Sequence, residues 1–428
     1  MLPVLLRPPS RRVHGWLIAW VVIAACAISL GAGSIDLAVY LRAAQAVAAG
    51  GDPNLTPPGE LPWFYPPFAA ALFVPLLALP FPVAAMAMAL ASAAALARLL
   101  HLVMARLGHP ELTLVALAGA VVAEPVYATL GYGQVNLMIA WLVAEGFLGR
   151  QRWLIGVAAG IKLTPLVFLL PLLVRRDLRG AGLATAGLAG TIGLGWVVAP
   201  AASGEFWSGL FLGATERIGT SYAANQSLTG ALWRAAGPGG VPLMGAALTV
   251  AVVLVGAAVL RRPDIDDILA LVVTGIAGLL VSPLSWVHHW IWVLPLVLWS
   301  VTNGRRRLAL AWSILLVGRV TWWFPSGGEA EYAHGLVGKL TQDSWTILAL
   351  ITLGVLAFAR TSVRGVAASG SASGLRGRDE CLRISGEGEV APDRTGGVLG
   401  EPALDIGDPR GVAGVRREMS GASVRDAR

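Results

Sequence analysis

The stretch WLIAWVVIAACAISLGAG (residues 16–33), followed by SIDLAVY (residues 34–40), decides how this chain is organised. The first part carries no charge and is long enough to cross a bilayer as a helix. Asp36 then lies about one helical turn beyond the predicted edge of the membrane. We therefore expect a carboxylate at the boundary between lipid and water, where it suits chemistry on a substrate with a lipid tail and a hydrophilic head.

The composition extends this prediction to the rest of the chain. Of the 428 residues, 56% are hydrophobic and only 13% are charged, whereas about a quarter of the residues of a soluble domain are charged. Apolar runs of membrane-spanning length recur from Trp16 to Arg360. The prediction is an all-α polytopic membrane protein with about ten to twelve transmembrane helices. The net charge of +7 comes mainly from Arg in short loops and in the tail, which gives no case for nucleic-acid binding.

Arginines near the N-terminus predict the orientation. Arg7, Arg11 and Arg12 precede the first span and place the N-terminus in the cytoplasm, so that Asp36 lies outside. The apolar residues of 37–49 have the spacing of an amphipathic helix that lies along the outer surface. The expected location is the plasma membrane with an extracytoplasmic active site. A cleaved signal peptide is the alternative interpretation of the N-terminal stretch.

The chain divides into three parts by composition. Residues 1–15 form a cytoplasmic N-terminus, and residues 16–360 form one transmembrane catalytic domain with extracytoplasmic loops. Residues 361–428 are rich in Gly, Ser, Arg and acidic residues and poor in large apolar ones. They cannot bury enough surface to fold alone, so a disordered cytoplasmic tail is expected.

Two segments do not fit a simple series of crossings. Prolines interrupt the apolar run at 68–79, which is re-entrant, peripheral, or one bent crossing together with the run that follows to residue 107. The run at 153–174 has Arg on both flanks, which a single crossing would place on opposite sides. A short hairpin with its tip at residues 162–165 removes this conflict, because irregular backbone is tolerated at membrane depth where it lines a cavity. An ordinary span that breaks the charge rule is the alternative.

In this topology a set of polar groups faces outward together with Asp36: Gln134, Asn136, Lys162, Asn225, His288 and His289. A general base must be a group within hydrogen-bond reach of the proton that it removes, and Asp36 is the candidate. The alternative is that Ser34 or Asp36 only caps the helix that follows.

Three cationic or ionisable groups could balance a departing phosphate. Lys162 lies in an apolar run, and a cation there is a functional candidate by default, although it could also extend to the interface. His288 and His289 could contact a phosphate, or they belong to an interfacial belt with neighbouring Trp residues. Adjacent His on a helix point about 100° apart and rarely hold one metal. Because Asp36 has no second acid beside it that would complete an Asp-x-Asp pair at the candidate site, we expect no metal and no cofactor.

Two turns are rich in amides. GYGQVN (131–136) and NQS (225–227) could bind sugar hydroxyls, or they serve only as turns. Glu124 and Glu145 also lie within apolar runs, and the sequence assigns them no role.

Several short patterns, in this order and spacing, resemble glycosyltransferase family 87, the polyprenyl-phosphate-mannose-dependent mannosyltransferases of the GT-C fold. The resemblance runs from Gly15 to Arg360. Its carriers are DLAVY (36–40) with GGDP (50–53), YPP (65–67), GQVN (133–136), GIKLTP (160–165), NQS (225–227) and SPLSW (282–286) with HH (288–289).

The resemblance implies an inverting glycosyltransferase. It would move mannose from a polyprenyl-phosphate donor to a glycolipid or lipoglycan acceptor on the outer face of the membrane and form an α-linked mannoside. The catalytic aspartate of the family maps to Asp36, and the family is thought to need no metal. A related subset transfers arabinofuranose, so an arabinosyl donor is the alternative. The long tail is not part of the shared pattern.

The expected partners are the lipid-linked donor, the glycolipid acceptor and membrane lipids, with no nucleic acid. Donor phosphate binding is assigned to Lys162, His288 and His289. Sugar and acceptor binding is assigned to Tyr40, Tyr65, Gln134, Asn136, Asn225 and Gln226.

Two other classes of function compete with sugar transfer. A transporter or flippase would line a path with the same groups, but transporters often contain two related halves, and this chain has no strong internal repeat. A purely structural membrane protein would not need long outer loops whose polar residues converge.

Overall fold

The structure, a computed structural model, describes residues 10–209, 220–237, 242–327 and 330–358. Within these ranges every regular element is a helix, and one isolated bridge pairs Asn225 with Trp286. The all-α prediction is therefore confirmed for the described residues. The predicted tail at 361–428 lies outside them.

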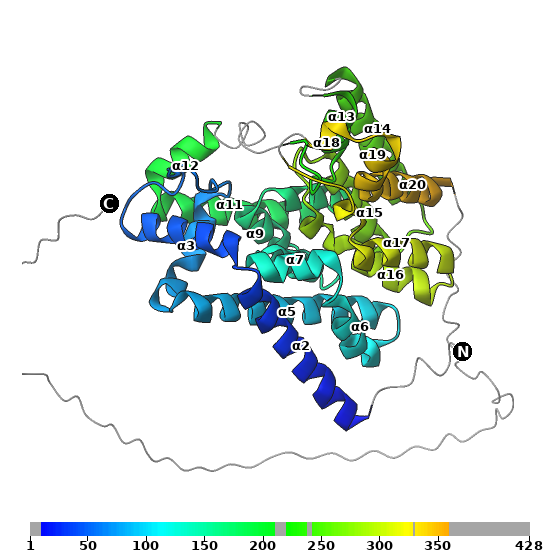
Figure 1. Ribbon diagram of the computed structural model, residues 1–428, viewed down its shortest axis with the longest axis horizontal. Coiled ribbons are helices and arrows are strands. Elements are labelled where there is room, and N and C mark those ends of the chain that lie inside the picture. The colour runs from blue at the N-terminus through cyan, green and yellow to red at the C-terminus, as the bar shows by residue number, and fades with distance from the viewer. Residues whose placement is uncertain (1–9, 210–219, 238–241, 328–329, 359–428) are drawn as a thin grey trace, which may run out of the picture. The chain divides into compact units, whose positions relative to one another are not determined.

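The first half of the chain contains α2 (Arg11–Gly31), α3 (Ile35–Ala48), α4 (Pro67–Phe73), η1 (Val74–Ala78), α5 (Phe81–Arg106), η2 (Pro110–Leu112), α6 (Thr113–Ala120), α7 (Glu124–Tyr132), α8 (Asn136–Phe147), α9 (Trp153–Ile161), η3 (Thr164–Phe168) and α10 (Leu169–Val174). The second half contains α11 (Leu178–Val198), α12 (Pro200–Trp207), α13 (Leu228–Ala236), α14 (Pro242–Leu260), α15 (Asp267–Val281), η5 (Val287–Trp292), α16 (Val293–Thr302), α17 (Arg306–Gly318), η6 (Val320–Trp322), α18 (Ala330–Ala333), α19 (Leu336–Gln342) and α20 (Ser344–Phe358). Figure 1 shows α5, α16 and α17 running in nearly the same direction.

Four described helices are long and apolar enough to cross a membrane, namely α2, α5, α11 and α14. The number rises to six if the bent pairs η2–α6 with α7 and α19 with α20, each bent by 68°, count as one span each. Shorter apolar helices of 10–17 residues accompany them. A polytopic membrane protein is confirmed, while the count of ten to twelve crossings stays a prediction.

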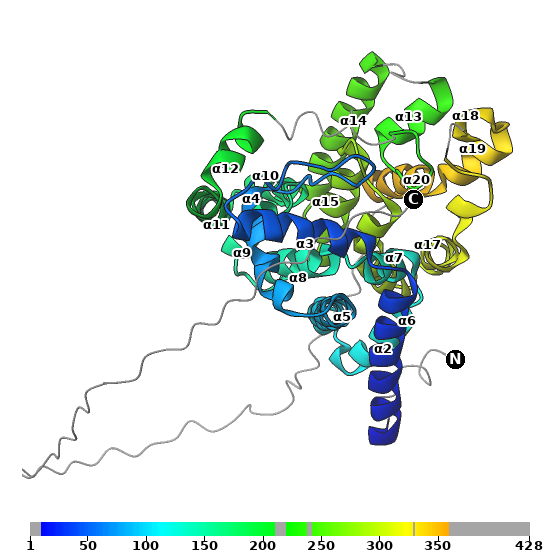
Figure 2. The same ribbon diagram turned by 60° about the vertical axis from the view of Figure 1, so that its left-hand side comes forward.

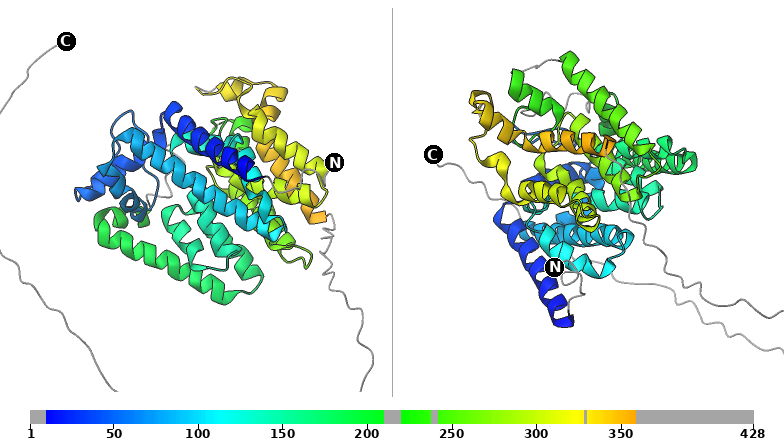
Figure 3. Two further views of the ribbon diagram at one scale, coloured as in Figure 1. Left: turned by 90° about the horizontal axis from the view of Figure 1, so that it is seen from below. Right: turned by 90° about the vertical axis from the view of Figure 1, so that its right-hand side faces the viewer.

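Helix α3 does not follow the direction of the long helices. In Figure 2 it lies across the view, whereas α5 and α11 are seen end-on. In the left view of Figure 3, α2, α5 and α11 slope in the same direction. Helix α2 packs against α5, whereas α11 packs against α9 and α4. One side of α3, including Leu37, Tyr40 and Ala44, is buried against the helices beneath it, as expected for an amphipathic helix that lies along a surface.

The run at 68–79 is separate from the crossing that follows it. It forms α4 and η1 and ends before Pro80, which precedes the first residue of α5. Because the 26 residues of α5 are long enough to cross by themselves, no bent crossing that includes 68–79 is needed.

The segment 153–174 is a hairpin, as predicted. Helix α9 ends at Lys162, where the backbone becomes extended, and η3 begins two residues later. The two flanks meet: Arg152 Nε lies 3.1 Å from Asp177 Oδ2, and the guanidinium groups of Arg152 and Arg175 lie 5.5 and 6.0 Å from the centre of the Phe147 ring. A single crossing would hold these flanks a membrane thickness apart, so the alternative of an ordinary span is wrong.

Other arginines gather at the same end of the helices as these flanks. Asp267, at the start of α15, accepts hydrogen bonds from Arg106 at 3.0 Å and from Arg175 at 2.7 Å. The ends of α5 and α10 therefore meet the start of α15. This arrangement fits the alternation of Arg-rich and Arg-poor loops from which the orientation was predicted.

Small residues let the hairpin lie directly on α11. A methyl group at Gly156 would collide with the carbonyl oxygen of Ala184, and one at Gly160 would collide with the side chain of Thr191. Likewise, Gly187 of α11 faces the carbonyl of Trp153. Closely spaced small residues allow membrane helices to approach backbone to backbone, where van der Waals packing replaces the missing hydrophobic driving force.

We expect Gly156→Ala to lower the melting temperature of the protein in detergent, because the added methyl group must displace the backbone of α11. Overpacking of this kind costs about 1–3 kcal/mol. Gly182→Ala on α11 is the matched control, since a methyl group there meets nothing within 4 Å. Equal melting temperatures for the two variants would contradict the packing described.

Candidate active site

Asp36 is held at the junction of α2 and α3 by the turn that follows α7. The backbone N–H of Ser34 donates to the carbonyl of Gly131 at 3.0 Å. Gly133 has φ +69°, and a methyl group there would lie 2.8 Å from Cβ of Leu37. Glycine is suited to both demands. This close approach brings Gln134 to Asp36.

The capping alternative fails for Ser34. Its hydroxyl donates to the carbonyl of Ser29 at 3.0 Å, and α3 has no side-chain cap. Asp36 lies in the first turn of α3, where the helix dipole favours a carboxylate. Its carboxylate interacts with the side chain of Gln134, which forms a hydrogen bond to it.

The carboxylate of Asp36 is tuned by opposing effects. Burial raises its pKa above the usual value, while the hydrogen bond from Gln134 and the positive charge of Lys162 lower it. Burial is the largest of the three causes. A carboxylate with a raised pKa is a stronger base than a solvated one.

Two tyrosines fix the amide of Gln134. Tyr40 Oη donates to Gln134 Oε1 at 2.6 Å, and Gln134 Nε2 lies 3.2 Å from Tyr65 Oη. The two hydroxyls are themselves 2.9 Å apart. Burial raises the pKa of both phenols, so they remain neutral. Tyr40 is only 1% exposed and lies behind Gln134, whereas Tyr65 is partly exposed.

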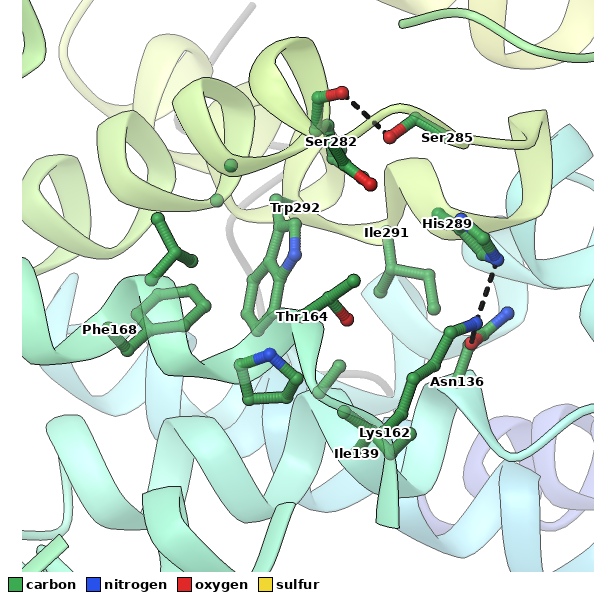
Figure 4. Close-up of a pocket in the computed structure, with 16 residues that line it drawn as sticks. Asn136, Ile139, Lys162, Thr164, Phe168, Ser282, Ser285, His289, Ile291 and Trp292 are labelled. Atoms are coloured by element: carbon green, nitrogen blue, oxygen red, sulfur yellow. Dashed lines mark hydrogen bonds between the residues drawn. The ribbon is translucent and has the colours of Figure 1, made fainter. Parts of the chain in front are cut away.

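Lys162 projects from the tip of the hairpin between two acceptors (Figure 4). Its Nζ lies 3.2 Å from Asn136 Oδ1 and 2.9 Å from His289 Nε2. Since an ammonium group only donates, Nε2 of His289 must accept, and this imidazole is neutral with its proton on Nδ1. The ring of Tyr65 lies 5.5 Å from the same ammonium.

His288 is placed differently from His289. Its carbonyl accepts from Asn136 Nδ2 at 3.4 Å and from Thr129 Oγ1 at 3.3 Å. Its ring packs at 4.6 Å from that of His289 and at 5.4 Å from that of Tyr132. Among the described residues, its buried Nε2 has no hydrogen-bond partner. The structure thus brings His289 directly to Lys162, and His288 orients Asn136 through its backbone.

A pocket with two chemically different ends opens beside Lys162. Its cavity volume is about 50 Å³, and it opens to the outside of the protein. Lys162, Asn136 and His289 line the polar end (Figure 4). The apolar end is lined by Phe168 and Trp292, whose rings lie 4.9 Å apart. This pocket suits an amphiphilic ligand with an anionic head and a hydrocarbon tail.

Two glycines of α15 make room for the walls of the pocket. A methyl group at Gly275 would collide with the indole of Trp292, and one at Gly278 would lie 2.9 Å from Val167. The absence of side chains here lets η3 and η5 approach α15 closely.

Asn225 and Gln226 do not line the pocket beside Lys162. Their side chains belong to a buried hydrogen-bond network between the outer loop and the turn before η5. Asn225 Nδ2 donates to the carbonyls of Thr220 and Pro283, and its Oδ1 accepts from the N–H of Ser285. Gln226 Nε2 donates to Gln342 O at 2.6 Å. Both are 0% exposed, so a role of these side chains in binding sugars stays a prediction that the geometry does not support.

The structure also shows ion pairs of two buried residues, Arg234 and Glu145, for which no role could be predicted from the sequence. Arg234 is fully buried, forms an ion pair with Asp343, and donates to the carbonyls of Tyr222 and Asn225. An Arg in the predicted outer loop at 200–240, which contains one other Arg, was the available signal. Glu145 forms an ion pair with Arg98 at 2.5 Å.

Within the described ranges, no three His, Cys, Asp or Glu side chains are grouped so that they could hold a metal ion. The expected independence from metal stays a prediction.

Comparisons with known proteins agree with one another. The model of glycosyltransferase family 87 matches residues 63–283, a range that includes Gln134, Asn136 and Lys162. A polyprenol-phosphate-mannose-dependent alpha-(1-2)-phosphatidylinositol pentamannoside mannosyltransferase of Mycolicibacterium smegmatis is 32% identical over 361 residues, which are 77% of this chain and 86% of the relative.

Two further relatives are similar over comparable lengths. The protein with the same description in Mycobacterium tuberculosis is 31% identical over 399 residues, or 83% of this chain and 90% of the relative. A polyprenol-phosphate-mannose-dependent alpha-(1-2)-phosphatidylinositol mannoside mannosyltransferase of M. smegmatis is 33% identical over 343 residues, or 71% and 78%. No solved structure matches the chain.

Proposed function

The chain belongs to glycosyltransferase family 87, and from this premise we propose that it transfers mannose from a polyprenyl-phosphate donor to a phosphatidylinositol mannoside or a similar glycolipid. Membership of the family removes the transporter and the purely structural protein from the candidates. The names of the relatives support both the donor and the class of acceptor. An arabinofuranosyl donor is the alternative within the family.

One observation carries the proposal: the carboxylate of Asp36 lies within electrostatic range of the Lys162 ammonium, and Lys162 lines the polar end of a pocket whose other end is apolar. Asp36 and Lys162 interact electrostatically although no hydrogen bond joins them among the described groups. A phosphosugar between them would meet a base on one side and a cation on the other. The apolar end of the pocket, at Phe168 and Trp292, would take the first part of the prenyl chain.

The proposed reaction is a single displacement with inversion. A hydroxyl oxygen of the acceptor attacks the anomeric carbon from the face opposite the phosphate. The bond between that carbon and the phosphate oxygen breaks, and its electron pair leaves with polyprenyl phosphate. The hydroxyl proton passes to the carboxylate of Asp36.

The protein balances the leaving charge with fixed groups. The three N–H donors of the Lys162 ammonium are directed by Asn136 and His289, so the phosphate meets a cation that is already oriented. Preorganised charge of this kind stabilises the transition state without reorganisation during the reaction. The amide of Gln134, fixed by Tyr40, orients Asp36.

The direct test is transfer of radiolabelled sugar in membranes that contain the protein. We expect label to pass from polyprenyl-phosphate mannose, and not from polyprenyl-phosphate arabinose, to a phosphatidylinositol mannoside. Asp36→Asn should reduce transfer by about 10²–10⁴-fold at unchanged expression, because the general base is lost. Transfer from the arabinosyl donor alone would favour the alternative, and more than half of wild-type turnover in the variant would show that Asp36 is not the base.

We expect Lys162→Met to raise the KM for the donor strongly and to leave the KM for the acceptor little changed. Removal of a charge from an apolar segment favours membrane insertion, so the variant should accumulate normally. Lys162→Arg should recover donor use only in part, because a planar guanidinium does not replace a compact point charge. Lys339→Met, which changes the other lysine of the chain, is the control. Wild-type kinetics in Lys162→Met would exclude Lys162 from phosphate binding.

The pH dependence of kcat/KM should report the state of Asp36. The base acts only when deprotonated, so activity falls as the pH drops through its raised pKa. Gln134→Leu removes a hydrogen bond that stabilises the carboxylate, which raises this pKa further. The acid limb of the profile should therefore move to higher pH, whereas Gln45→Leu on the exposed side of α3 should leave it in place. A shift to lower pH would contradict the assigned contact.

We propose that the site faces the outside of the plasma membrane, since the Arg-rich loops gather at the opposite end of the helices. In a background of Cys26→Ser and Cys381→Ser, cysteines at the exposed positions Ser208 and Gln151 can be compared. An impermeant thiol reagent should label Ser208→Cys in intact cells and Gln151→Cys only after lysis. The reverse pattern would invert the topology.

A further inference from the structure

Four aromatic rings that the proposed reaction does not use lie close to the site. Tyr132, Tyr222, Trp286 and Trp322 form what we call the aromatic cluster. Ring centres of Tyr222 and Trp286 are 6.1 Å apart, and those of Tyr222 and Trp322 are 5.9 Å apart. Tyr132 lies between Gly131, whose carbonyl accepts from the N–H of Ser34 at 3.0 Å, and Gly133, which approaches Leu37 closely. The cluster is therefore adjacent to the candidate base.

His288 and His289 connect the aromatic cluster to the pocket beside Lys162. His289 contacts Lys162, whereas His288 packs against the ring of Tyr132. Tyr132 and the Lys162 ammonium thus contact different members of this histidine pair.

The rings are fixed by contacts from several elements. Glu124, at the start of α7, accepts from the indole N–H of Trp322 at 2.5 Å. The carbonyl of Tyr222 accepts from the buried guanidinium of Arg234 at 3.0 Å. The backbone of Trp286 pairs with that of Asn225. These contacts hold the ring of Trp322 and the backbones that carry Tyr222 and Trp286. A surface on segments that are already ordered costs less entropy when a ligand binds.

The rings also keep exposed surface. Tyr222 is 37% exposed, and Tyr132, Trp286 and Trp322 are partly exposed. A sugar ring has apolar C–H faces and a polar rim, so it can stack on an aromatic face while its hydroxyls remain solvated. Tyr and Trp, with an apolar body and a polar tip, suit such a surface.

We propose that the aromatic cluster binds the sugar rings of the acceptor glycolipid and presents its hydroxyl to Asp36. The inference rests on the proposed function, because only transfer with inversion requires the acceptor to approach from the side opposite the phosphate. The acceptor would then be a lipid that already carries sugar. The buried ion pair of Arg234 and Asp343 would position the loop that contains Tyr222.

The test is a comparison of acceptor and donor kinetics in purified full-length protein with a phosphatidylinositol mannoside as acceptor. Tyr222→Leu should raise the KM for the acceptor about tenfold, with the donor KM and the kcat at saturating acceptor close to wild type. Tyr222→Phe keeps the ring and should retain a KM near that of wild type. Trp323→Leu is the matched control, because Trp323 is 67% exposed and follows Trp322 in the chain but has no ring contact with the cluster among the described residues.

Two results would overturn the inference. One is an unchanged acceptor KM in Tyr222→Leu. The other is an equal loss of membrane accumulation in Tyr222→Leu and Trp323→Leu with unchanged kinetics, as expected for rings that only belong to an interfacial aromatic belt. If Tyr222→Leu does not accumulate at all, Trp286→Leu enters the same comparison and the same criteria apply. Failure of the wild type to transfer mannose would instead refute the proposed function, so the two failures are distinguishable.

Discussion

The position of Lys162 is the constraint on which the rest of the site depends. A cation within an apolar segment is costly unless polar groups surround it. Here the helix that carries it is interrupted, and the ammonium is met by an amide oxygen of α8 and an imidazole nitrogen of η5. Three segments far apart in the chain must therefore converge. Their convergence creates the polar end of the pocket beside apolar walls.

The hairpin that delivers Lys162 depends on close backbone packing. Its first arm has nine residues and is about 14 Å long, shorter than the roughly 30 Å of a bilayer core. Gly156 and Gly160 let this arm lie against α11 without intervening side chains, while Arg152 and Asp177 join its flanks. Packing and charge thus hold the tip in one place, which a site that must align two substrates requires.

The site combines the Asp36 carboxylate, whose pKa is raised by burial, with the Lys162 cation, which partly offsets that rise. Each charged group reduces the cost of burying the other, although they come from separate helices. Beside His288, the aromatic cluster is held by contacts from α7, α13 and the loop before α13. This division of the surroundings into an anion-binding side and an aromatic side fits a reaction in which donor and acceptor approach one carbon from opposite faces.

The helical membrane class and the candidate groups Asp36 and Lys162 could be predicted from the sequence, as could a hairpin at 153–174 as one of two alternatives. Hydropathy and the distribution of arginines are properties of local stretches, and lipid imposes them directly on the chain. The family also followed from short motifs and their order. The sequence could not predict that His289 contacts Lys162 whereas His288 packs against Tyr132. Two adjacent residues of one type differ only in the tertiary contacts of their side chains.

Which polar residues line the candidate site and which stabilise the fold could be seen only in the tertiary structure. Asn225 and Gln226 carry the same amide groups as Asn136 and Gln134. Their side chains are nevertheless buried and donate hydrogen bonds to backbone carbonyls that join the outer loop to other segments. Likewise, only the structure shows that Arg234 is buried and donates several hydrogen bonds. It also brings together aromatic residues from four separate segments. An amide or a ring takes its role from the partners that folding brings to it, and those partners lie tens to hundreds of residues away in the chain.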